Sequence, residues 1–425
     1  MKKNRKGSDH LNKDQVKKRW ESIDSQEALS TKAKLEKLVK LNLKKRERLE
    51  KKVNMPRRDA IQGAFTIREF HYPLDTNFKH IELSQWEEVS SQDLVVLSGD
   101  DGFKKVDPMK ILFFDVETTG ISGGTGTIPF MLGFGFFETG FFRVKVFILN
   151  DLNREDELLD KVDEFLENQE FSATVTYNGK SFDFPLMETR YILNRKRFPL
   201  LKKPHMDFLF PARTIWKNTY ESRKLGYLGD IILGISRQED VDGSQIPSIY
   251  FSYLRSNQFF LLEKVVEHNA LDLVGLSALM LQGVTYLKDV SNTRDEGEVL
   301  GAALLFEKSG YFNKANELFE IAKQSAKRQD VIFKAVKHLS ILKKKEKCYE
   351  EATALWKILS GLKDHFALRE LSIHFEHREK DYYGALEFVH RAIEEIELTD
   401  MQRKDLEKRL RRLQRKIQKL ENQED

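Results

Sequence analysis

The chain has 425 residues, of which 40% are hydrophobic and 11% aromatic, and its formal net charge is +4. This length exceeds one ordinary core, so two or three domains are expected, and the apolar content is ample for globular structure. The single cysteine, Cys348, excludes an internal disulfide and a cysteine-based zinc site, and it is typical of a protein of the reducing cytoplasm.

The N-terminal 60 residues form a basic arm. They contain 20 Lys or Arg against 9 Asp or Glu, a balance of +11 that leaves −7 for the rest of the chain. Such arms often bind nucleic acid through phosphate contacts, and the alternative is a solvated tail that aids solubility. Apolar spacing predicts a helix within 26–54. No apolar run reaches the ~18 residues that a membrane helix needs, so we expect a soluble, cytoplasmic protein that is not exported.

Residues 61–108 contain short mixed segments whose role is not evident from the sequence. Residues 109–290 alternate strand-like with helix-like stretches, which predicts an α/β domain. Within it we expect strands over 111–114, 130–137, 141–149 and 173–177, and helices over 155–166 and 265–276. The residues Glu138-Thr139-Gly140 predict a hairpin between the second and third strands.

Two carboxylates follow the first of these strands. Asp115 and Glu117 are two positions apart, so on a strand they point to the same side. Burying two like charges is costly unless a cation lies between them, and Mg²⁺ and Mn²⁺ prefer oxygen ligands. The pair therefore predicts a divalent metal site. The alternative is a carboxylate pair at an exposed strand end.

Further acidic residues occupy comparable positions. Asp183 follows the strand 173–177, at the edge where open α/β sheets bind ligands. His268 and Asp272 are four residues apart on a predicted helix and share one face. Alone, a His–Asp pair at this spacing is commonly a surface contact.

Together these segments resemble the exonuclease domains of the DEDD superfamily, which have the ribonuclease H-like fold. The motif Asp-x-Glu-Thr-Thr-Gly matches residues 115–120, and Tyr-Asn-x-x-x-Phe-Asp-x-Pro matches residues 177–185. The third motif, a Tyr or His ahead of the last Asp, matches His268 and Asp272, with His268 at the tyrosine-type spacing of four residues. The Gly-rich loop 120–127 and the run from His268 to Leu273 resemble more narrowly the bacterial YprB-type proteins, the mitomycin repair factor B family, over about residues 61–395.

The resemblance implies two-metal phosphodiester hydrolysis with two Mg²⁺ or Mn²⁺ ions. The implied metal ligands are Asp115, Glu117, Asp183 and Asp272, all counted as catalytic. His268 is implied as the general base that takes a proton from the attacking water. The expected substrate contacts are Thr118, Asn178 and Lys180. Asp207 and Arg213, which follow the second motif, are interpreted as structural.

From residue 298 onward the pattern changes to helical hairpins with an internal repeat. Each copy has an aromatic residue, an Ala three later, a large apolar residue four after that, and a small or apolar residue three further on. The copies are Phe312/Ala315/Phe319/Ala322, Tyr349/Ala352/Trp356/Leu359 and Tyr382/Ala385/Val389/Ala392. The alanines are 37 and 33 residues apart, which resembles tetratricopeptide repeats. The last helix, over 400–420, is basic on one face; we interpret it as a solvent-facing cap, the alternative being a nucleic-acid contact.

We therefore expect an α/β ribonuclease H-like exonuclease domain followed by an all-α tetratricopeptide-like repeat domain. The predicted boundaries are 1–60 for the arm, 61–108 for a small subdomain, 109–290 for the exonuclease domain, 298–398 for the repeats and 399–425 for the basic C-terminal helix. The expected function is 3′–5′ exonuclease action on DNA in repair; the alternatives are an exoribonuclease in RNA processing and a catalytically silent scaffold. A protein partner is expected on the repeats, for which the family resemblance suggests a DNA helicase, and no membrane is expected.

Overall fold

The computed structural model describes residues 63–120, 126–235, 241–290 and 295–424. The basic arm, its expected helix and residues 121–125 of the Gly-rich loop lie outside the described residues.

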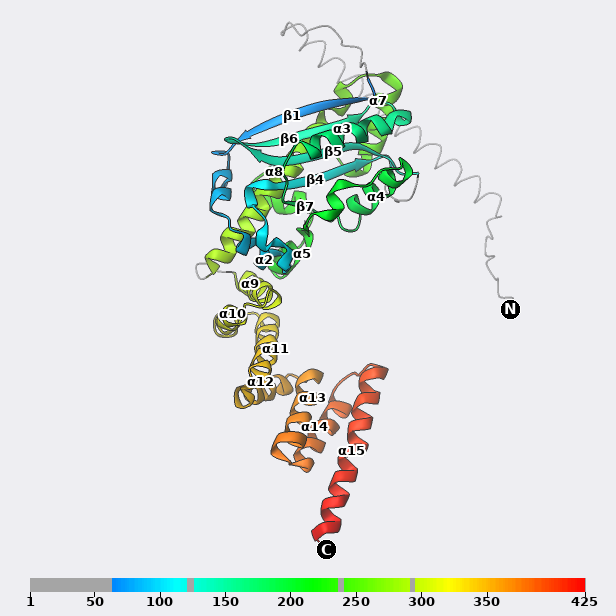
Figure 1. The fold of residues 1–425 in the computed structure, drawn as a ribbon. Helices are drawn as coiled ribbons and strands as arrows, with labels where there is room; N and C mark the ends of the chain where they lie inside the picture. The colour runs from blue at the N-terminus through cyan, green and yellow to red at the C-terminus, as the bar shows by residue number, and fades with distance from the viewer. Residues whose placement is uncertain (1–62, 121–125, 236–240, 291–294, 425) are drawn as a thin grey trace, which may run out of the picture. The chain divides into compact units, whose positions relative to one another are not determined.

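A six-stranded mixed sheet is the centre of the N-terminal domain (Figure 1). Its spatial order is β1-β6-β5-β4-β7-β8. Neighbouring strands from β1 to β4 run antiparallel, whereas β4, β7 and β8 run parallel. The strands are β1 (Phe65–Pro73), β4 (Ile111–Thr118), β5 (Pro129–Glu138), β6 (Phe141–Leu149), β7 (Ala173–Thr176) and β8 (His205–Asp207), with a separate small pair, β2 (Asn77–Phe78) and β3 (Ile81–Glu82).

These strands confirm the expected α/β domain, with two differences. The first expected strand continues from its apolar run through the acidic residues to Thr118, because its backbone stays paired with β5 as far as Pro129. Strand β8 was not expected: three residues after a proline are too few to show a period. The expected hairpin is present, and Gly140 adopts the positive φ, +80°, that its turn requires.

The segment 61–108 supplies the edge of the same sheet. Strand β1 pairs with β6 over its whole length, from Phe65 opposite Leu149 to Pro73 opposite Phe141. The short helix α2 (Ser91–Ser98) follows and contributes Leu94 and Leu97 to the core.

Helices cover both faces of the sheet (Figure 1). On one face Phe165 of α3 packs against rings of β5 and β6, and Phe184 of α4 packs against Phe114 of β4. The opposite face is covered by the long helix α8. The helices of this domain are α3 (Glu155–Glu167), α4 (Asp183–Leu193), α5 (Leu209–Trp216), α6 (Leu225–Leu228), α7 (Ile246–Ser256) and α8 (Phe260–Lys288).

Helix α8 is the core helix of this domain. Among the helices that the structure describes, it is the one whose length and composition would allow it to cross a membrane, and 78% of that stretch is buried inside the protein. Core helices pass the same test, so the apolar character of α8 is accounted for by its burial against the sheet.

Helix α8 approaches the sheet most closely at Gly133 of β5. A Cβ at Gly133 would lie 2.0 Å from Oδ1 of Asn269 and 2.7 Å from Cδ1 of Leu273, both on α8. Only a residue without a side chain permits this distance. Gly133 is also the residue opposite Asp115 in the pairing of β4 with β5, so the contact lies beside the acidic pair.

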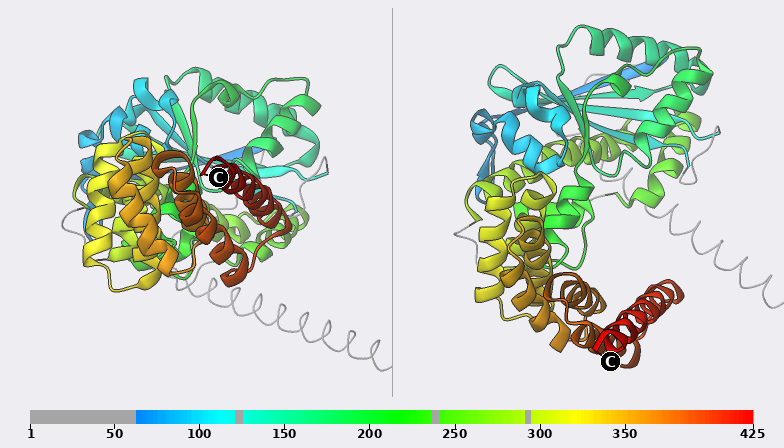
Figure 2. Two further views of the ribbon diagram at one scale, coloured as in Figure 1. Left: turned by 90° about the horizontal axis from the view of Figure 1, so that it is seen from below. Right: turned by 60° about the horizontal axis from the view of Figure 1, so that its bottom comes forward.

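The C-terminal region consists of helices alone (Figure 2). They are α9 (Glu296–Lys308), α10 (Phe312–Ser325), α11 (Gln329–Lys345), α12 (Tyr349–Gly361), α13 (His365–His374), α14 (Tyr382–Glu395) and α15 (Asp400–Glu424), with a π-helical turn, η9 (Phe375–Glu379), after α13. The aromatic residue of each sequence repeat is the first residue of α10, α12 and α14, and each repeat alanine is fully buried. The expected helical hairpins with one shared packing pattern are thus confirmed.

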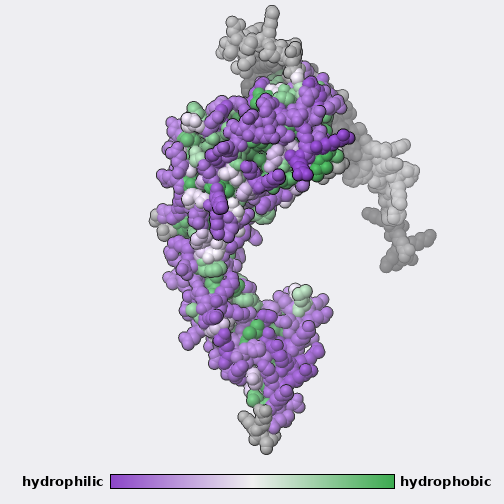
Figure 3. Space-filling model, viewed as in Figure 1, coloured by the Kyte–Doolittle hydropathy of each residue, from purple (hydrophilic) through white to green (hydrophobic). Residues whose placement is uncertain are grey.

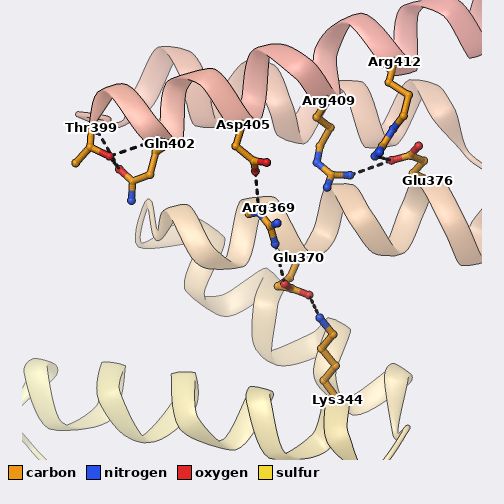
Figure 4. A network of polar contacts seen from close by, with 9 residues as sticks. All are labelled: Lys344, Arg369, Glu370, Glu376, Thr399, Gln402, Asp405, Arg409 and Arg412. Atoms are coloured by element: carbon orange, nitrogen blue, oxygen red, sulfur yellow. Dashed lines mark hydrogen bonds and ion pairs between the residues drawn. The ribbon is translucent and has the colours of Figure 1, made fainter.

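Helix α15 docks on α13 and α14 through an apolar cluster and a buried carboxylate. Leu406 and Leu413 pack in a cluster with Leu368 and the repeat residues of α14. Glu376, whose side chain is 0% exposed, accepts hydrogen bonds from three bases of α15 (Figure 4 shows two of them). The three donors are Arg409 and Lys416, both at 2.9 Å, and Arg412. Burial disfavours the charge of Glu376, but the bonds from Lys416 and Arg412 outweigh it and lower its pKa.

The substitution Gly133→Ala is expected to destabilise the protein by about 1–3 kcal/mol, because α8 must move away from β5 to admit the methyl group. Urea unfolding of the full chain measures this change. Gly243→Ala is the control, since a Cβ there meets nothing within 4 Å. Equal stability of the two variants would contradict the close approach.

The substitution Glu376→Gln is expected to weaken the docking of α15, because it leaves the buried Arg409 without its countercharge. A loss of about 3 kcal/mol corresponds to roughly 100-fold faster amide hydrogen exchange in α15. The control is Glu387→Gln, an exposed residue of α14. Because the pKa of Glu376 is lowered, its contribution is present at neutral pH and is lost as pH falls through that lowered pKa, so the two proteins should converge in acid. Unchanged exchange at neutral pH would show that the apolar cluster alone holds α15.

Candidate active site

Strand β4 carries the acidic pair onto the face that α8 covers. Asp115 lies opposite Gly133 and Glu117 opposite Met131 in the pairing with β5, and both side chains are half-buried. The pairing shifts by a bulge between Glu117 and Thr118, where the strand ends. The two carboxylates therefore share one side at the carboxyl end of a central strand, as their spacing predicted.

Asn269 of α8 fixes one oxygen of Asp115. Its fully buried amide donates from Nδ2 to Oδ2 of Asp115 at 2.7 Å. Oδ1 of Asn269 lies toward Gly133 and has no hydrogen-bond partner in the described structure. One oxygen of Asp115 is thus held in place by a neutral donor that leaves the charge of the carboxylate uncompensated.

Asp183 is the first residue of α4 and lies near the same carboxylates. Its pKa is raised well above the usual range, first by burial and then by the negative charges of Asp115 and Asp207. A Cβ at Gly179 would lie 2.8 Å from Oδ2 of Asp183 and 2.4 Å from Oγ1 of Thr176, so the glycine of the second motif makes room for this carboxylate.

The carboxylate of Asp272 comes from α8. Burial, followed by the charge of Asp272, raises the pKa of Asp115 to about 7, and His268 opposes this shift. Nε2 of His268 lies 3.4 Å from Oδ2 of Asp272, so the i, i+4 pair faces Asp115 and is not a surface contact. The structure therefore brings together Asp115, Asp183, Asp272 and His268 from three separate segments.

Asp207 organises the loop between β7 and α4. Its buried carboxylate accepts from the backbone amides of Asn178 at 2.7 Å and of Lys180 and Leu209, each at 3.1 Å. These bonds hold Asn178 in a left-handed conformation with φ of +71°. The structural interpretation of Asp207 agrees with this geometry.

His205 supports the first turn of α4. Its ring stacks on Phe184 at 3.7 Å between centroids, and Nε2 lies 2.9 Å from Oγ1 of Thr176. Burial, and secondarily the charge of Lys180, lowers the pKa of His205 to about 4, so the ring is neutral at pH 7.

The three expected substrate contacts differ in how far they are exposed and bonded. Lys180 is exposed, Thr118 donates its hydroxyl hydrogen to the carbonyl oxygen of Gly120 at 2.7 Å, and Asn178 is half-buried. Phe182, immediately before Asp183, is 59% exposed. Phe130 and Phe134, by contrast, are fully buried core residues.

The chemistry of these donors fits a hard divalent cation. Mg²⁺ and Mn²⁺ prefer carboxylate oxygens, and the raised pKa values of Asp115 and Asp183 reflect negative charge that burial leaves unbalanced. In the part of the chain that the structure describes, no three Asp, Glu, His or Cys side chains are grouped as ready ligands.

Sequence reasoning did not assign roles to Asn269, Gly133 and Gly179. The polar Asn269 within the apolar stretch of α8 was a signal, since a fully buried amide needs a partner. Nothing in the sequence near the two glycines indicated their roles. A side chain at either position would clash with side chains whose places are set by the tertiary fold.

Comparison with known proteins shows the family. Residues 112–282 match the family model described as RNase_H superfamily, so the domain has the fold of a superfamily of nucleases that act on nucleic acid. The "Uncharacterized protein YprB" of Bacillus subtilis (strain 168) is 32% identical over 359 residues, which is 82% of this chain and 86% of that relative. The alignment is longer than the 112–282 domain of this chain. The chain therefore belongs to the YprB family, with a ribonuclease H superfamily domain at residues 112–282.

Proposed function

We propose that the protein is a metal-dependent 3′–5′ exonuclease that hydrolyses phosphodiester bonds of DNA. The observation that carries this proposal is the convergence of β4, α4 and α8: Asn269 of α8 binds Asp115, the charge of Asp272 acts on Asp115, and the charge of Asp115 acts on Asp183. The preference for DNA and a role in repair rest on the resemblance to the mitomycin repair factor B family.

The metal ligands in this proposal are Asp115, Glu117, Asp183 and Asp272. Two divalent ions bound there supply Lewis-acid activation of water and stabilisation of the leaving 3′ oxygen. His268 takes the proton from the attacking water, and its contact with Asp272 orients the ring. Asn269 keeps Asp115 oriented, and the buried face of α8 excludes bulk water from one side.

The substrate strand in this proposal runs past the exposed end of the second motif. Lys180 contacts a phosphate, the ring of Phe182 stacks on a base, and the polar groups of Thr118 and Asn178 contact the terminal nucleotide. We also propose that the C-terminal helices form a tetratricopeptide-like stack that binds a protein partner, for which a DNA helicase is the candidate.

The substitution Asp183→Asn is expected to abolish metal-dependent cleavage. The loss should exceed the ~10–100-fold that is typical when a residue that hydrogen-bonds to a metal ligand is replaced. The assay uses 5′-labelled single- and double-stranded DNA and matched RNA, with Mg²⁺, Mn²⁺ or EDTA. Glu188→Gln, an exposed residue of the same helix, is the control and should retain activity.

The products distinguish the candidate functions. A ladder that shortens from the 3′ end supports the exonuclease, and preferential loss of RNA would favour the exoribonuclease. Binding without cleavage of any substrate would favour the silent scaffold. Full metal-dependent activity in Asp183→Asn would refute the assigned site.

The substitution Asp115→Asn is expected to stabilise the metal-free protein above pH 7. Because the folded-state pKa of Asp115 is raised to about 7, its protonation favours the folded protein at low pH, and this stabilisation is lost as pH rises through 7. Asparagine has no charge to desolvate and can still accept from Asn269.

Thermal unfolding in EDTA at pH 5 and pH 8 measures the difference between variant and parent. The gain in Tm should be largest at pH 8 and smaller at pH 5, because the difference grows between the ordinary carboxyl pKa and about 7, and Mg²⁺ should raise the Tm of the parent more than that of the variant. A variant less stable than the parent at pH 8 in EDTA would contradict the crowding of charge at this position.

A further inference from the structure

The C-terminal helix α15 has two basic faces, and the fold uses only one of them. Leu406, Leu413 and Ile417 are buried against the preceding helices, and the neighbouring bases Arg409, Arg412 and Lys416 bind the buried Glu376. These contacts set the rotation of α15 about its own axis. They therefore determine which residues of the helix point outward.

The outward residues include a stripe that we call the α15 ridge. At ~100° per residue, five basic positions spaced four, three, four and four residues apart lie within about 80° of the helix circumference. They are Lys404, Lys408, Arg411, Arg415 and Lys419, all exposed. At ~1.5 Å per residue the ridge is about 22 Å long. The surface around α13–α15 is hydrophilic in the view of Figure 3.

The charges of the ridge are mostly unbalanced within the described residues. Arg411 lies 3.6 Å from Glu407 on the preceding turn. In the described part of the chain, the other four bases have neither an ion-pair partner nor a side-chain hydrogen bond. Like charges at i, i+4 destabilise a helix, and nothing in the packing of α15 requires them there. The arrangement is thus slightly unfavourable for the free helix, and a bound polyanion would relieve this repulsion.

The composition of α15 favours a duplex over a single strand or a protein partner. Residues 400–424 contain no Phe, Tyr or Trp, so the helix offers no ring for the stacking that single-strand binders use. The ridge also has no apolar centre of the kind that a protein interface needs. A straight row of cations can lie along a duplex, of which about 22 Å of axis carries roughly 13 phosphate charges on the two strands together.

We propose that the α15 ridge binds the phosphate backbone of double-stranded DNA, as a contact surface separate from the candidate active site. The duplex then lies along the last helix while the nuclease domain acts on a strand end. The assignment concerns binding alone and does not depend on whether the protein cleaves the DNA. It replaces the interpretation of α15 as only a solvent-facing cap.

The test uses the full-length protein in EDTA, so that no metal-dependent cleavage takes place, and a fluorescent DNA duplex longer than the ridge. The variant replaces Lys404, Lys408, Arg415 and Lys419 with Gln. Anisotropy titrations over a range of salt concentrations give log K against log[salt], and loss of four phosphate contacts should reduce the magnitude of the slope by about 3–4.

The matched control removes the same charge from the helices and connections that precede α15. It replaces Lys327, Lys347, Lys357 and Lys363, all exposed, with Gln. A smaller change of slope in the control than in the ridge variant supports the proposal. An equal change of slope in both variants would show that binding depends on total charge and not on the ridge, and would overturn the proposal. Amide exchange in α15 verifies that the ridge variant is still docked through Glu376.

Further comparisons test whether binding by the ridge is independent of nuclease activity and whether it is specific to a duplex. Because binding is measured in EDTA, the comparison of ridge variant and control holds whether or not the parent proves to be a nuclease. A single strand of equal length should lose less of its slope in the ridge variant than the duplex does. An unchanged duplex slope in the ridge variant, or a loss confined to the single strand, would overturn the assignment.

Discussion

The close approach of helix α8 to strand β5 is the constraint on which the site depends. Gly133 lies opposite Asp115, and its missing side chain lets Asn269 come close enough to bind that carboxylate. The same approach carries His268 and Asp272, on adjacent turns of α8, to within electrostatic reach of Asp115. A wider separation between helix and sheet would leave these groups as ordinary polar residues at the end of a core helix.

Holding the carboxylates close together lowers the stability of the folded protein when no cation is bound. Burial and mutual repulsion raise the pKa values of Asp115 and Asp183, so the charged site is less stable without cations than an apolar site of the same shape would be. The surrounding structure resists this repulsion with rigid supports. Asp207 holds two backbone amides of the second motif and that of Leu209, and the ring of His205 stacks on Phe184 at the start of α4.

The C-terminal region also buries a carboxylate. Glu376 is buried among three bases, so that its charge is balanced and its pKa is lowered. The same bonds turn the ridge bases of α15 to the outside, where, among the residues that the structure describes, only Arg411 has a carboxylate partner, Glu407. The buried charge of Glu376 is thus balanced, whereas those of Asp115 and Asp183 are crowded together, and that contrast separates an internal anchor from a candidate metal site.

Local sequence determined most of the elements and the identity of the acidic residues. The apolar run before Asp115, the turn at Gly140 and the repeated aromatic-alanine spacing each reflect contacts with near neighbours in the chain, so their periods predicted strand, hairpin and helix. The spacing of Asp115 with Glu117, and of His268 with Asp272, likewise placed each pair on one face. Only the tertiary structure decided which pairs meet, that β1 completes the sheet, that Asn269 lies over Gly133 and that Glu376 orients α15. These are contacts between segments far apart in the chain, and no local period encodes them, because they follow from how closely whole helices and sheets can pack.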